Sequence, residues 1–494
     1  MSLISVNNLT FGYDGSLKNI FENVSFNIDT DWKLGLIGRN GKGKTTFLKL
    51  LLGKYEYQGA ISKNVEFDYF PFEVKNKERM AIEIVNEIAP NVEDWEIIRE
   101  LNLLNTDTEV LYRSFNLLSG GEQIKILLIS LFLKGNNFLL IDEPTNHLDI
   151  ETRNNLVNYL EKKKGFILVS HDRNFLDKVV NHIISINNTN IEIQQGNFSS
   201  WKENKNRQDN FEKIQNERLQ KDINRLEIAS KNCAKWSNEA EKTKNKKYNS
   251  ETTIDKGYIG HKADKMMKKS KVMEQRIEKA INEKTNLLKN IEVNDTLKII
   301  PLKSNKNPLI FAHNLQIKYS KETIFNPITF EVNNGDRVAL IGKNGIGKSS
   351  ILKLILGEEL QYNGEFMVAN DLKISYVSQS TEDLKGNSRT FAYDNKINES
   401  IFKAMLVKMG LSQFDFDTNI QDMSEGQKKK VLIAKSISEQ ANIYIWDEPL
   451  NYIDILTREQ IEDAILNYNP TIIFVEHDEK FIEKVATKII NLVK

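Results

Sequence analysis

The chain has 494 residues, with 68 Lys and Arg balanced by 68 Asp and Glu. This length suits two or three domains, each large enough to bury a core. A single cysteine excludes an internal disulfide, and six histidines show no metal-ligand spacing. No apolar run reaches the roughly 18 residues that cross a bilayer, and the N-terminus lacks the layout of a signal peptide. We therefore expect a soluble, cytoplasmic protein.

One set of motifs occurs twice, in the same order and at an almost constant offset. The stretch GRNGKGKT at 38–45 recurs as GKNGIGKS at 342–349, an offset of 304. Ser119 recurs as Ser424, at an offset of 305. A shared order at a shared offset indicates that a whole domain has been duplicated.

Each of these glycine loops follows an apolar segment and precedes an amphipathic one, which is the strand, loop and helix order of a phosphate-binding motif. Closely spaced glycines let backbone N–H groups converge on phosphates, the lysine supplies a positive charge, and the hydroxyl that follows can ligate Mg²⁺. We predict two ATP sites that use Mg²⁺. The predicted binding residues are Gly38, Asn40, Gly41, Gly43, Lys44, Thr45 and Thr46 in the first copy and Gly342, Asn344, Gly345, Gly347, Lys348, Ser349 and Ser350 in the second.

An aspartate and a glutamate together end a later apolar segment in each copy. The aspartate can hold Mg²⁺, and the glutamate can polarise the attacking water. A histidine that follows a further apolar segment is expected near the γ-phosphate. The predicted metal ligands are Thr45, Ser349, Asp142 and Asp447, and the predicted catalytic residues are Glu143, Glu448, His171 and His477.

The stretch LSGGEQ at 118–123 is similar to the signature of ABC-type ATPases, and MSEGQ at 423–427 is its counterpart in the second copy. The resemblance implies an α/β fold with two tandem ABC-type P-loop nucleotide-binding domains that hydrolyse ATP to ADP and phosphate. In that family the domains face head to tail, so that each ATP lies between the glycine loop of one copy and the signature of the other. The resemblance adds the signature residues Ser119, Gly120, Gly121, Ser424 and Gly426, the adenine-stacking residues Tyr13 and Tyr319, and Gln379 as an ATP-binding residue and Mg²⁺ ligand.

The two copies depart from that family pattern unequally. Gln379 matches the glutamine of the family's Q-loop, whereas the first copy has Phe72 there, and Glu425 replaces a signature glycine in the second copy. Head-to-tail pairing puts both departures in site 1, which contains Lys44, and leaves site 2, which contains Lys348, complete. Our hypothesis is that site 1 turns over more slowly and acts partly as an ATP-dependent latch.

A linker separates the copies, and we place the domains at 1–200 and 306–494 with the linker at 201–305. Residues 201–300 contain 24 Lys and Arg against 16 Asp and Glu, so this stretch carries +8 and the rest of the chain −8. A basic segment on an acidic body suggests a polyanionic partner. A solvated helix surface is the alternative reading of the charge alone.

Apolar residues in the linker recur with a helical rhythm over 211–240 and again over 266–291. The polar stretch at about 243–261 lies between them. The pattern predicts a long antiparallel helical hairpin with its tip in that polar stretch.

Tandem ABC domains with a two-helix linker resemble the ABC-F family of ribosome-associated ATPases, and KADKMMKKSK at 262–271 looks like that family's linker. The resemblance implies that the protein is a monomer without an obligate protein partner. Its expected partners are the exit site of the 70S ribosome, 23S rRNA and the P-site tRNA. The predicted RNA or ribosome contacts are Lys244, Lys246, Lys247, Tyr248, Lys256, Tyr258, His261, Lys262, Lys265, Lys268 and Lys269.

Within ABC-F, only about 70 residues separate Thr46 from Leu118, which leaves little room for the extra arm of some general translation factors. The extended tip resembles ribosomal protection proteins of the Lsa and Vga types. The resemblance implies direct or allosteric displacement of lincosamides, pleuromutilins and group A streptogramins by the linker tip, followed by release on ATP hydrolysis. The alternatives are a general ABC-F translation factor and, less favoured, the ATPase subunit of a membrane exporter or a DNA-repair ATPase.

Overall fold

The structure, a computed structural model, describes residues 2–13, 19–135, 137–146, 148–187, 190–245, 265, 268, 271–273, 275–280, 296–319 and 322–494. The chain forms two compact units. The ABC unit comprises Met1–Trp201 and Asn294–Lys494, and the linker unit comprises Lys202–Val293. Within the described ranges, no helix is long and apolar enough to cross a membrane.

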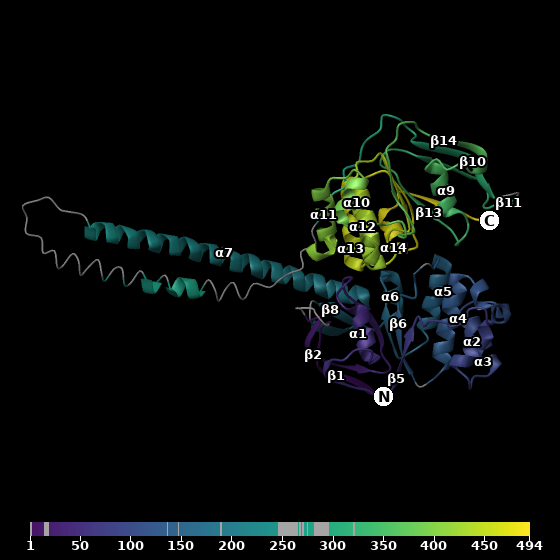
Figure 1. The fold of residues 1–494 in the computed structure, drawn as a ribbon, viewed down its shortest axis with the longest axis horizontal. Helices are drawn as coiled ribbons and strands as arrows, with labels where there is room; N and C mark the ends of the chain where they lie inside the picture. Colours follow the sequence, from purple (N-terminus) through teal and green to yellow (C-terminus); the bar gives the residue numbers. More distant parts are fainter. Residues whose placement is uncertain are drawn as a thin grey trace, which may run out of the picture. The chain divides into compact units, whose positions relative to one another are not determined.

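The first copy alternates strands and helices (Figure 1). Its elements are β1 (Leu3–Phe11), β2 (Phe21–Asp29), β3 (Lys33–Ile37), α1 (Lys44–Leu51), β4 (Gln58–Ser62), β5 (Glu66–Phe70), α2 (Ala81–Ile88), α3 (Asp94–Leu103), 3-10 turns at Thr108–Tyr112 and Phe115–Leu117, α4 (Gly120–Leu133), β6 (Asn137–Asp142), α5 (Ile150–Leu160), β7 (Phe166–Val169), α6 (Arg173–Val179), β8 (His182–Asn187) and β9 (Asn190–Gln195).

The second copy repeats this sequence of elements, with the short strand β11 added after its first strand and, within the described residues, without a counterpart of β9. They are β10 (Ile310–Tyr319), β11 (Glu322–Thr323), β12 (Ile328–Val332), β13 (Arg337–Ile341), α9 (Lys348–Ile355), β14 (Gln361–Val368), β15 (Ile374–Val377), α10 (Ser388–Asp394), α11 (Glu399–Lys408), 3-10 turns at Gln413–Phe416 and Ile420–Asp422, α12 (Glu425–Ser438), β16 (Ile443–Asp447), α13 (Ile455–Tyr468), β17 (Ile472–Val475), α14 (Glu479–Val485) and β18 (Lys488–Asn491).

Both copies are built on a parallel sheet with the same strand order. In the first copy the order is β5-β6-β7-β3-β8, with β9 added antiparallel at the edge, and in the second it is β15-β16-β17-β13-β18. A smaller antiparallel sheet accompanies each, with β1 or β10 at its centre. The matching order confirms the predicted α/β fold with two tandem P-loop domains.

Each parallel sheet is buried on both faces because its central strands are apolar throughout. In β6, Phe138 and Leu140 contribute to the hydrophobic cluster that includes α1. Leu139 and Ile141, on the other face of the strand, contribute to the cluster that includes α2, α3 and α4. The same alternation occurs in β16, so the strand ends that carry the predicted site residues are fixed from both sides.

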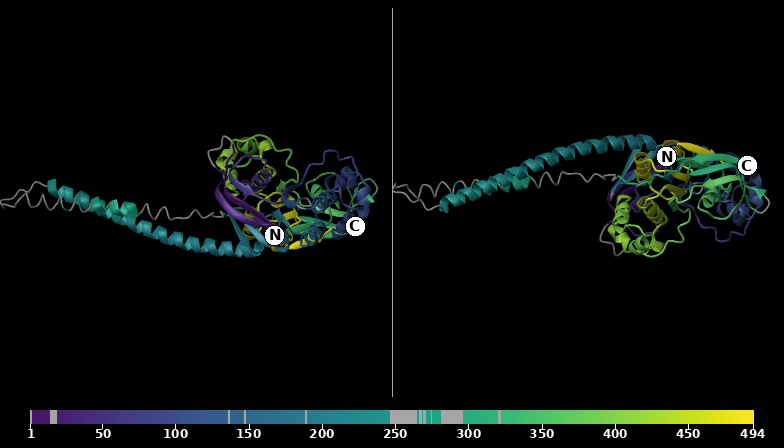
Figure 2. Two further views of the ribbon diagram at one scale, coloured as in Figure 1. Left: turned by 90° about the horizontal axis from the view of Figure 1, so that it is seen from below. Right: turned by 90° about the horizontal axis from the view of Figure 1, so that it is seen from above.

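The linker begins in a single long helix, α7 (Phe198–Asn245). Figure 2 shows α7 as one continuous, gently curved helix. Among the apolar residues expected to pack, Ile223 and Ile277 are buried, whereas Phe211 and Ile214 are 60% and 50% exposed. The predicted tip residues 246–261 lie outside the described residues.

Buried ion pairs join the two copies within the ABC unit. Arg173 in α6 pairs with Glu462 in α13, and the Glu462 side chain is fully buried. Lys484 also donates to Glu462, at 3.0 Å. A buried carboxylate that loses its charge leaves its cationic partners uncompensated, so this contact helps to hold the copies in register.

We predict that Glu462→Gln lowers the free energy of unfolding by about 3 kcal/mol, because buried Arg173 would lose its closest anionic partner and keep only the longer, 4.0 Å contact with Asp478. Urea denaturation measures this change. The matched control is Asp463→Asn on the neighbouring residue, whose side chain is 62% exposed and also contacts Lys484. Its effect should stay within about 0.5 kcal/mol, and equal losses in the two variants would contradict the buried ion pair's role.

Candidate functional site

The topology brings the predicted catalytic segments together at one edge of each parallel sheet. In the first copy, β3 runs into the glycine loop, β6 ends at Asp142, and β7 ends two residues before His171. These strands are adjacent and parallel, so their carboxyl ends meet at the same edge. The second copy repeats the arrangement with β13, β16 and β17.

Glycine is required where each loop enters its helix. Gly43 and Gly347 precede α1 and α9 with φ of 94° and 99°, in the left-handed region. A Cβ at Gly43 would also lie 2.6 Å from the Ile20 side chain. The loop can therefore turn its backbone N–H groups inward only with glycine at this position.

The loop lysines point into the loops. Lys44 Nζ donates to the carbonyl of Gly38 at 2.8 Å, and Lys348 Nζ donates to Gly342 at 2.7 Å. Both side chains are buried, and burial lowers the pKa of each below its ordinary value, although nearby carboxylates oppose the shift. A cation held at the centre of a glycine loop is placed to meet phosphate oxygens.

The two predicted catalytic glutamates share a strained backbone. Glu143 and Glu448 have φ of 51° and 46°, which non-glycine residues rarely adopt. The backbone N–H of each donates to the end of the neighbouring strand, at Val169 (2.9 Å) and Val475 (3.1 Å). Strain that recurs at matching positions of both copies is typical of functional sites.

Each glutamate lies beside the histidine of its own copy. His171 Nε2 is 3.3 Å from Glu143 Oε1, and His477 Nε2 is 3.7 Å from Glu448 Oε1. Burial, followed by the charge of Asp142, raises the pKa of Glu143 to about 8. Burial lowers the pKa of both histidines, so each imidazole is neutral at pH 7.

The predicted metal ligands are hydroxyls and carboxylates in contact with one another. Thr45 Oγ1 donates to Asp142 Oδ2 at 3.1 Å, and Ser349 hydrogen-bonds to Asp447. Asp447 Oδ1 is buried without a hydrogen-bond partner. Among the described residues, no group of three or more His, Cys, Asp or Glu side chains is placed to hold a metal. This oxygen donor set fits Mg²⁺ that keeps water and phosphate ligands.

Gln379 and the two predicted adenine-stacking tyrosines each contact another predicted site residue. Gln379 Nε2 donates to Glu448 Oε2 at 3.0 Å, whereas Phe72 packs against the core of the first copy. The Tyr13 hydroxyl lies 2.8 Å from Thr46 Oγ1, and the Tyr319 hydroxyl lies 3.2 Å from Ser350 Oγ. Both tyrosine rings remain about half exposed, and the Tyr13 ring also makes T-shaped contacts with Phe11 and Tyr55.

Each glycine loop faces the segment that follows the acidic pair of the other copy. At site 1, Asn40 Nδ2 donates to the carbonyl of Tyr452 at 2.6 Å. At site 2, the N–H of Asn344 donates to Asp149 Oδ2 at 3.4 Å. The pairing is therefore head to tail in both sites, and at site 2 Lys343 also pairs with Glu151 at 2.8 Å.

The aspartates that face the opposite glycine loops differ in burial between the two sites. Asp454 forms a 2.6 Å ion pair with Lys430, and both side chains are almost fully buried. Asp149, the matching residue at site 2, is half-buried. A cavity of about 320 Å³ opens at site 2, and its lining includes Lys348, Ser349 and Gln379.

The signature residues start the helices α4 and α12. Ser119 and Ser424 are the N-caps and form capping boxes with Glu122 and Gln427. Glycine is needed most at Gly426, where a Cβ would lie 2.6 Å from Asn40 Nδ2 and 2.7 Å from the Tyr452 carbonyl. A Cβ at Gly120 would meet nothing within 4 Å, and at Gly121 the nearest atoms, in Leu148 and Thr152, are 3.5 Å away.

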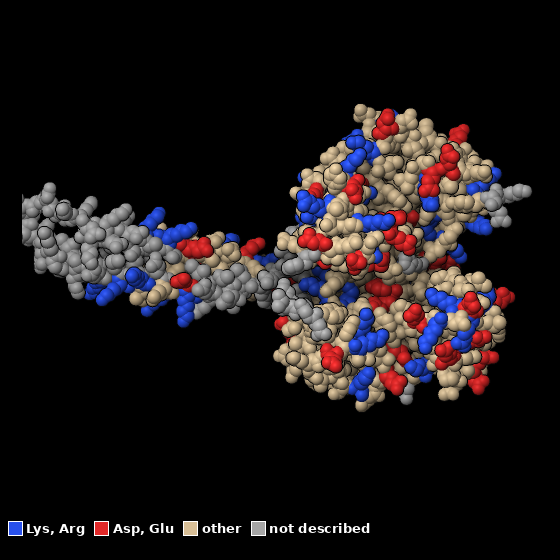
Figure 3. All heavy atoms as spheres, viewed as in Figure 1, with Lys and Arg blue, Asp and Glu red and all other residues tan. Residues whose placement is uncertain are grey.

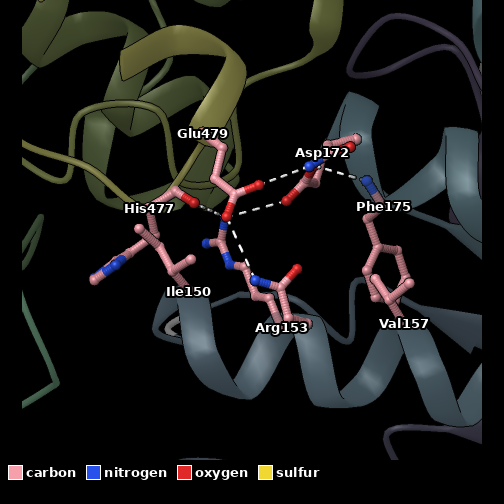
Figure 4. A pocket seen from close by; sticks show the side chains of 9 residues that line it. Ile150, Arg153, Val157, Asp172, Phe175, His477 and Glu479 are labelled. Carbon is pink, nitrogen blue, oxygen red and sulfur yellow. Dashed lines mark hydrogen bonds and ion pairs between the residues drawn. The ribbon is translucent and has the colours of Figure 1, made fainter. Parts of the chain in front are cut away.

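Sequence reasoning missed a buried arginine between the sites. Figure 4 shows Arg153 directed toward Asp172 and the backbone of His477. Arg153 Nη1 donates to the His477 carbonyl of the other copy at 2.9 Å and to Asp172 Oδ2 at 3.3 Å. The repeat could have predicted the importance of Arg153 and Asp172, because Arg458 and Asp478 occupy the corresponding positions of the second copy.

The predicted linker contacts are only partly within the described residues. Lys244 lies in α7, and Lys265 and Lys268 are exposed helical residues that line an apolar groove with Leu226 and Ile277. Figure 3 shows basic side chains on the described part of the linker unit. The remaining predicted contacts, Lys246, Lys247, Tyr248, Lys256, Tyr258, His261, Lys262 and Lys269, lie outside the described residues.

Comparison with known proteins identifies similar chains over the whole length. The profile of the family described as ABC transporter matches residues 21–146 and 325–451. The ATP-binding protein Uup of Buchnera aphidicola is 30% identical over 99% of this chain and 80% of its own. Ribosome protection protein VmlR of Bacillus subtilis is 28% identical over 96% of this chain and 84% of its own.

A solved structure has the same fold. It is the archaeal ribosome recycling factor aABCE1, in complex with the archaeal ribosomal stalk protein aP1. The TM-score is 0.64 at 19% identity, and the match covers 98% of this chain and 87% of that one. At this identity the similarity supports the fold alone.

We predict that Gly426→Ala lowers ATP turnover at site 1 by about tenfold or more, because the added methyl group would overlap Asn40 and Tyr452. The assay uses the Glu448→Gln background, where site 2 is silenced. Gly121→Ala, measured at site 2 in the Glu143→Gln background, is the matched variant and should cause a smaller loss, since its nearest neighbours are 3.5 Å away. A larger loss for Gly121→Ala would contradict the closer packing of site 1.

Proposed function

The chain belongs to the ABC transporter family, as an ABC-F ATP-binding protein with two ABC domains, and on that premise we propose that it binds ribosomes and protects them from antibiotics. Its ABC domains hydrolyse ATP. In this proposal, ATP binding brings the protein to the exit site of the 70S ribosome. The linker then reaches 23S rRNA and the P-site tRNA near the peptidyl-transferase centre, and hydrolysis releases the protein.

The observation that carries the proposal is the similarity to VmlR, whose name states ribosome protection. That similarity covers 96% of the chain and so includes the linker as well as the ABC domains. The linker's excess of basic residues supports an RNA partner, because lysines and arginines that neutralise phosphates release counterions. We propose lincosamides, pleuromutilins and group A streptogramins as the displaced drugs.

A general ABC-F translation factor is the second candidate. The 30% identity to Uup, which is named only as an ATP-binding protein, favours it. The two candidates share ATP hydrolysis and ribosome binding, and they differ in drug protection. An exporter subunit remains the weakest candidate, because it leaves the basic linker without a role.

For ATP hydrolysis we propose that the two sites use matching side chains. Lys44 and Lys348 neutralise the phosphate oxygens, and Glu143 and Glu448 orient and deprotonate the attacking water. The neutral histidines donate a hydrogen bond toward the γ-phosphate. The Mg²⁺ ligands are Thr45 and Asp142 at site 1 and Ser349, Asp447 and Gln379 at site 2, and Mg²⁺ would supply charge neutralisation of the phosphates.

We further propose that site 1 is the slower site. Burial and the charge of the adjacent Asp142 raise the pKa of Glu143 to about 8, so less of this carboxyl is in its ionised, basic form at pH 7. Site 1 also lacks a Q-loop glutamine, since Phe72 stands in that position. The tight contact between Asn40 and Tyr452 suits a site that holds ATP longer.

We predict that Glu448→Gln removes most of the ATP turnover and that Glu143→Gln removes about a fifth or less, because site 2 carries most of the flux. Steady-state phosphate release measures turnover, and binding of a fluorescent ATP analogue controls for intact sites. Equal losses in the two variants would overturn the asymmetry.

For the ribosome, we predict that the Glu143→Gln, Glu448→Gln double variant co-sediments with 70S ribosomes only when ATP is present. Adding Lys265→Glu and Lys268→Glu should weaken this binding about tenfold and flatten its salt dependence, because two phosphate contacts are lost. The control is Lys54→Glu with Lys385→Glu, which reverses two exposed charges of the ABC unit.

Absence of co-sedimentation with both sites loaded would overturn the ribosome proposal. A drug-inhibited translation assay then separates the two candidates. Restored translation in the presence of a lincosamide supports protection, and binding without restoration supports the general translation factor.

A further inference from the structure

The signature of the second copy is hydrogen-bonded to the Q-loop segment of the same copy. Thr381, two residues after Gln379, donates its hydroxyl proton to Glu425 Oε2 at 2.6 Å. Lys428 holds the other oxygen of Glu425, at 2.9 Å. The glutamate that departs from the ABC signature pattern thus has a specific partner inside its own domain.

A buried lysine makes a second connection between the same two segments. Lys429 in α12 donates to the carbonyl of Ser378 at 2.9 Å, directly before Gln379. Its side chain is almost fully buried, and burial lowers its pKa although four nearby carboxylates, beginning with Glu476, favour the charged form. A buried cation that donates to a loop carbonyl fixes that loop firmly.

The first copy lacks the side chains for both contacts. Aligned by the repeat, Gly120 corresponds to Glu425, Ile124 to Lys429 and Val74 to Thr381. Glycine, isoleucine and valine side chains cannot form these hydrogen bonds. The connection therefore belongs to one copy only.

Its two ends serve different ATP sites. Gly426, next to Glu425, packs against Asn40 of site 1. Gln379, between Ser378 and Thr381, donates to Glu448 of site 2. In the head-to-tail pairing, the signature of the second copy belongs to site 1 and its Q-loop belongs to site 2. The hydrogen bonds between these two segments therefore connect site 2 with site 1.

We propose that Ser378, Thr381, Glu425 and Lys429 form a coupling brace that makes the state of Gln379 at site 2 control the position of the signature at site 1. These are positioning residues, which act on ATP through Gln379 and Gly426. The coupling runs through the second copy alone. It concerns how the two sites communicate and does not depend on the ribosome as partner.

The test measures ATP turnover at site 1 in the Glu448→Gln background, where site 2 holds ATP without cleaving it. In the intact brace, Gln379→Ala should lower site 1 turnover about three- to tenfold, which is the scale of one hydrogen bond between uncharged groups, since the amide oxygen that Glu448→Gln introduces can still accept from Gln379. With Thr381→Val, Glu425→Gly and Lys429→Ile, which install the first-copy side chains at all three positions, Gln379→Ala should change site 1 turnover less than about 1.5-fold.

Two further variants separate positioning from folding. Thr381→Ser, with Glu425 and Lys429 unchanged, keeps the hydroxyl and should retain the sensitivity to Gln379→Ala. Thr390→Val, which removes a helix-capping hydroxyl of the same copy, should leave that sensitivity unchanged. The proposal is overturned if Gln379→Ala has no effect on site 1 with the brace intact, or the same effect with and without it.

Discussion

Each ABC copy completes its buried core with a residue from the other copy, and the geometry of both ATP sites depends on this exchange. Ile455 lies in the hydrophobic cluster of the first copy, and Ile150 packs against that of the second. Each directly follows the aspartate that faces the opposite glycine loop. Because the isoleucines fix where Asp149 and Asp454 stand, apolar packing sets the separation of the copies and polar contacts complete it.

The two copies share one backbone architecture, but different polar side chains surround their ATP sites. Strand order, glycine loops and the strained glutamates are shared. The charges are matched, because Asp454 forms an ion pair with buried Lys430 and Asp149 interacts with the corresponding buried Lys125, but Asp149 itself remains half-buried. Duplication thus supplied two equivalent scaffolds, and later substitutions such as Glu425 and Phe72 gave each site its own environment. The asymmetry lies in side chains that surround the reacting groups and leaves the groups themselves in place.

The repeated motifs predicted the fold class and the strand ends where the site residues stand, because a glycine loop and an acidic pair each require a particular local backbone. They could not predict partners that are distant in sequence. Glu425 was recognisable as a departure from the signature, but its contact with Thr381 needed the folded domain. Arg153 looked like one more charged residue of a helix, and only folding shows that it reaches His477 of the other copy. Motif spacing therefore predicts the local chemistry of each site, but it does not predict contacts between the copies.

The two ends of the linker are anchored in different copies of the ABC unit. Phe198, at the start of α7, is buried in the core of the first copy, and Leu297 and Ile299 are buried in that of the second. α7 continues without a break for 48 residues, or about 72 Å at 1.5 Å per residue. A stiff rod of that length turns a rotation of a few degrees at its root into a displacement of several ångströms at its far end. Small relative movements of the two copies would therefore be amplified mechanically.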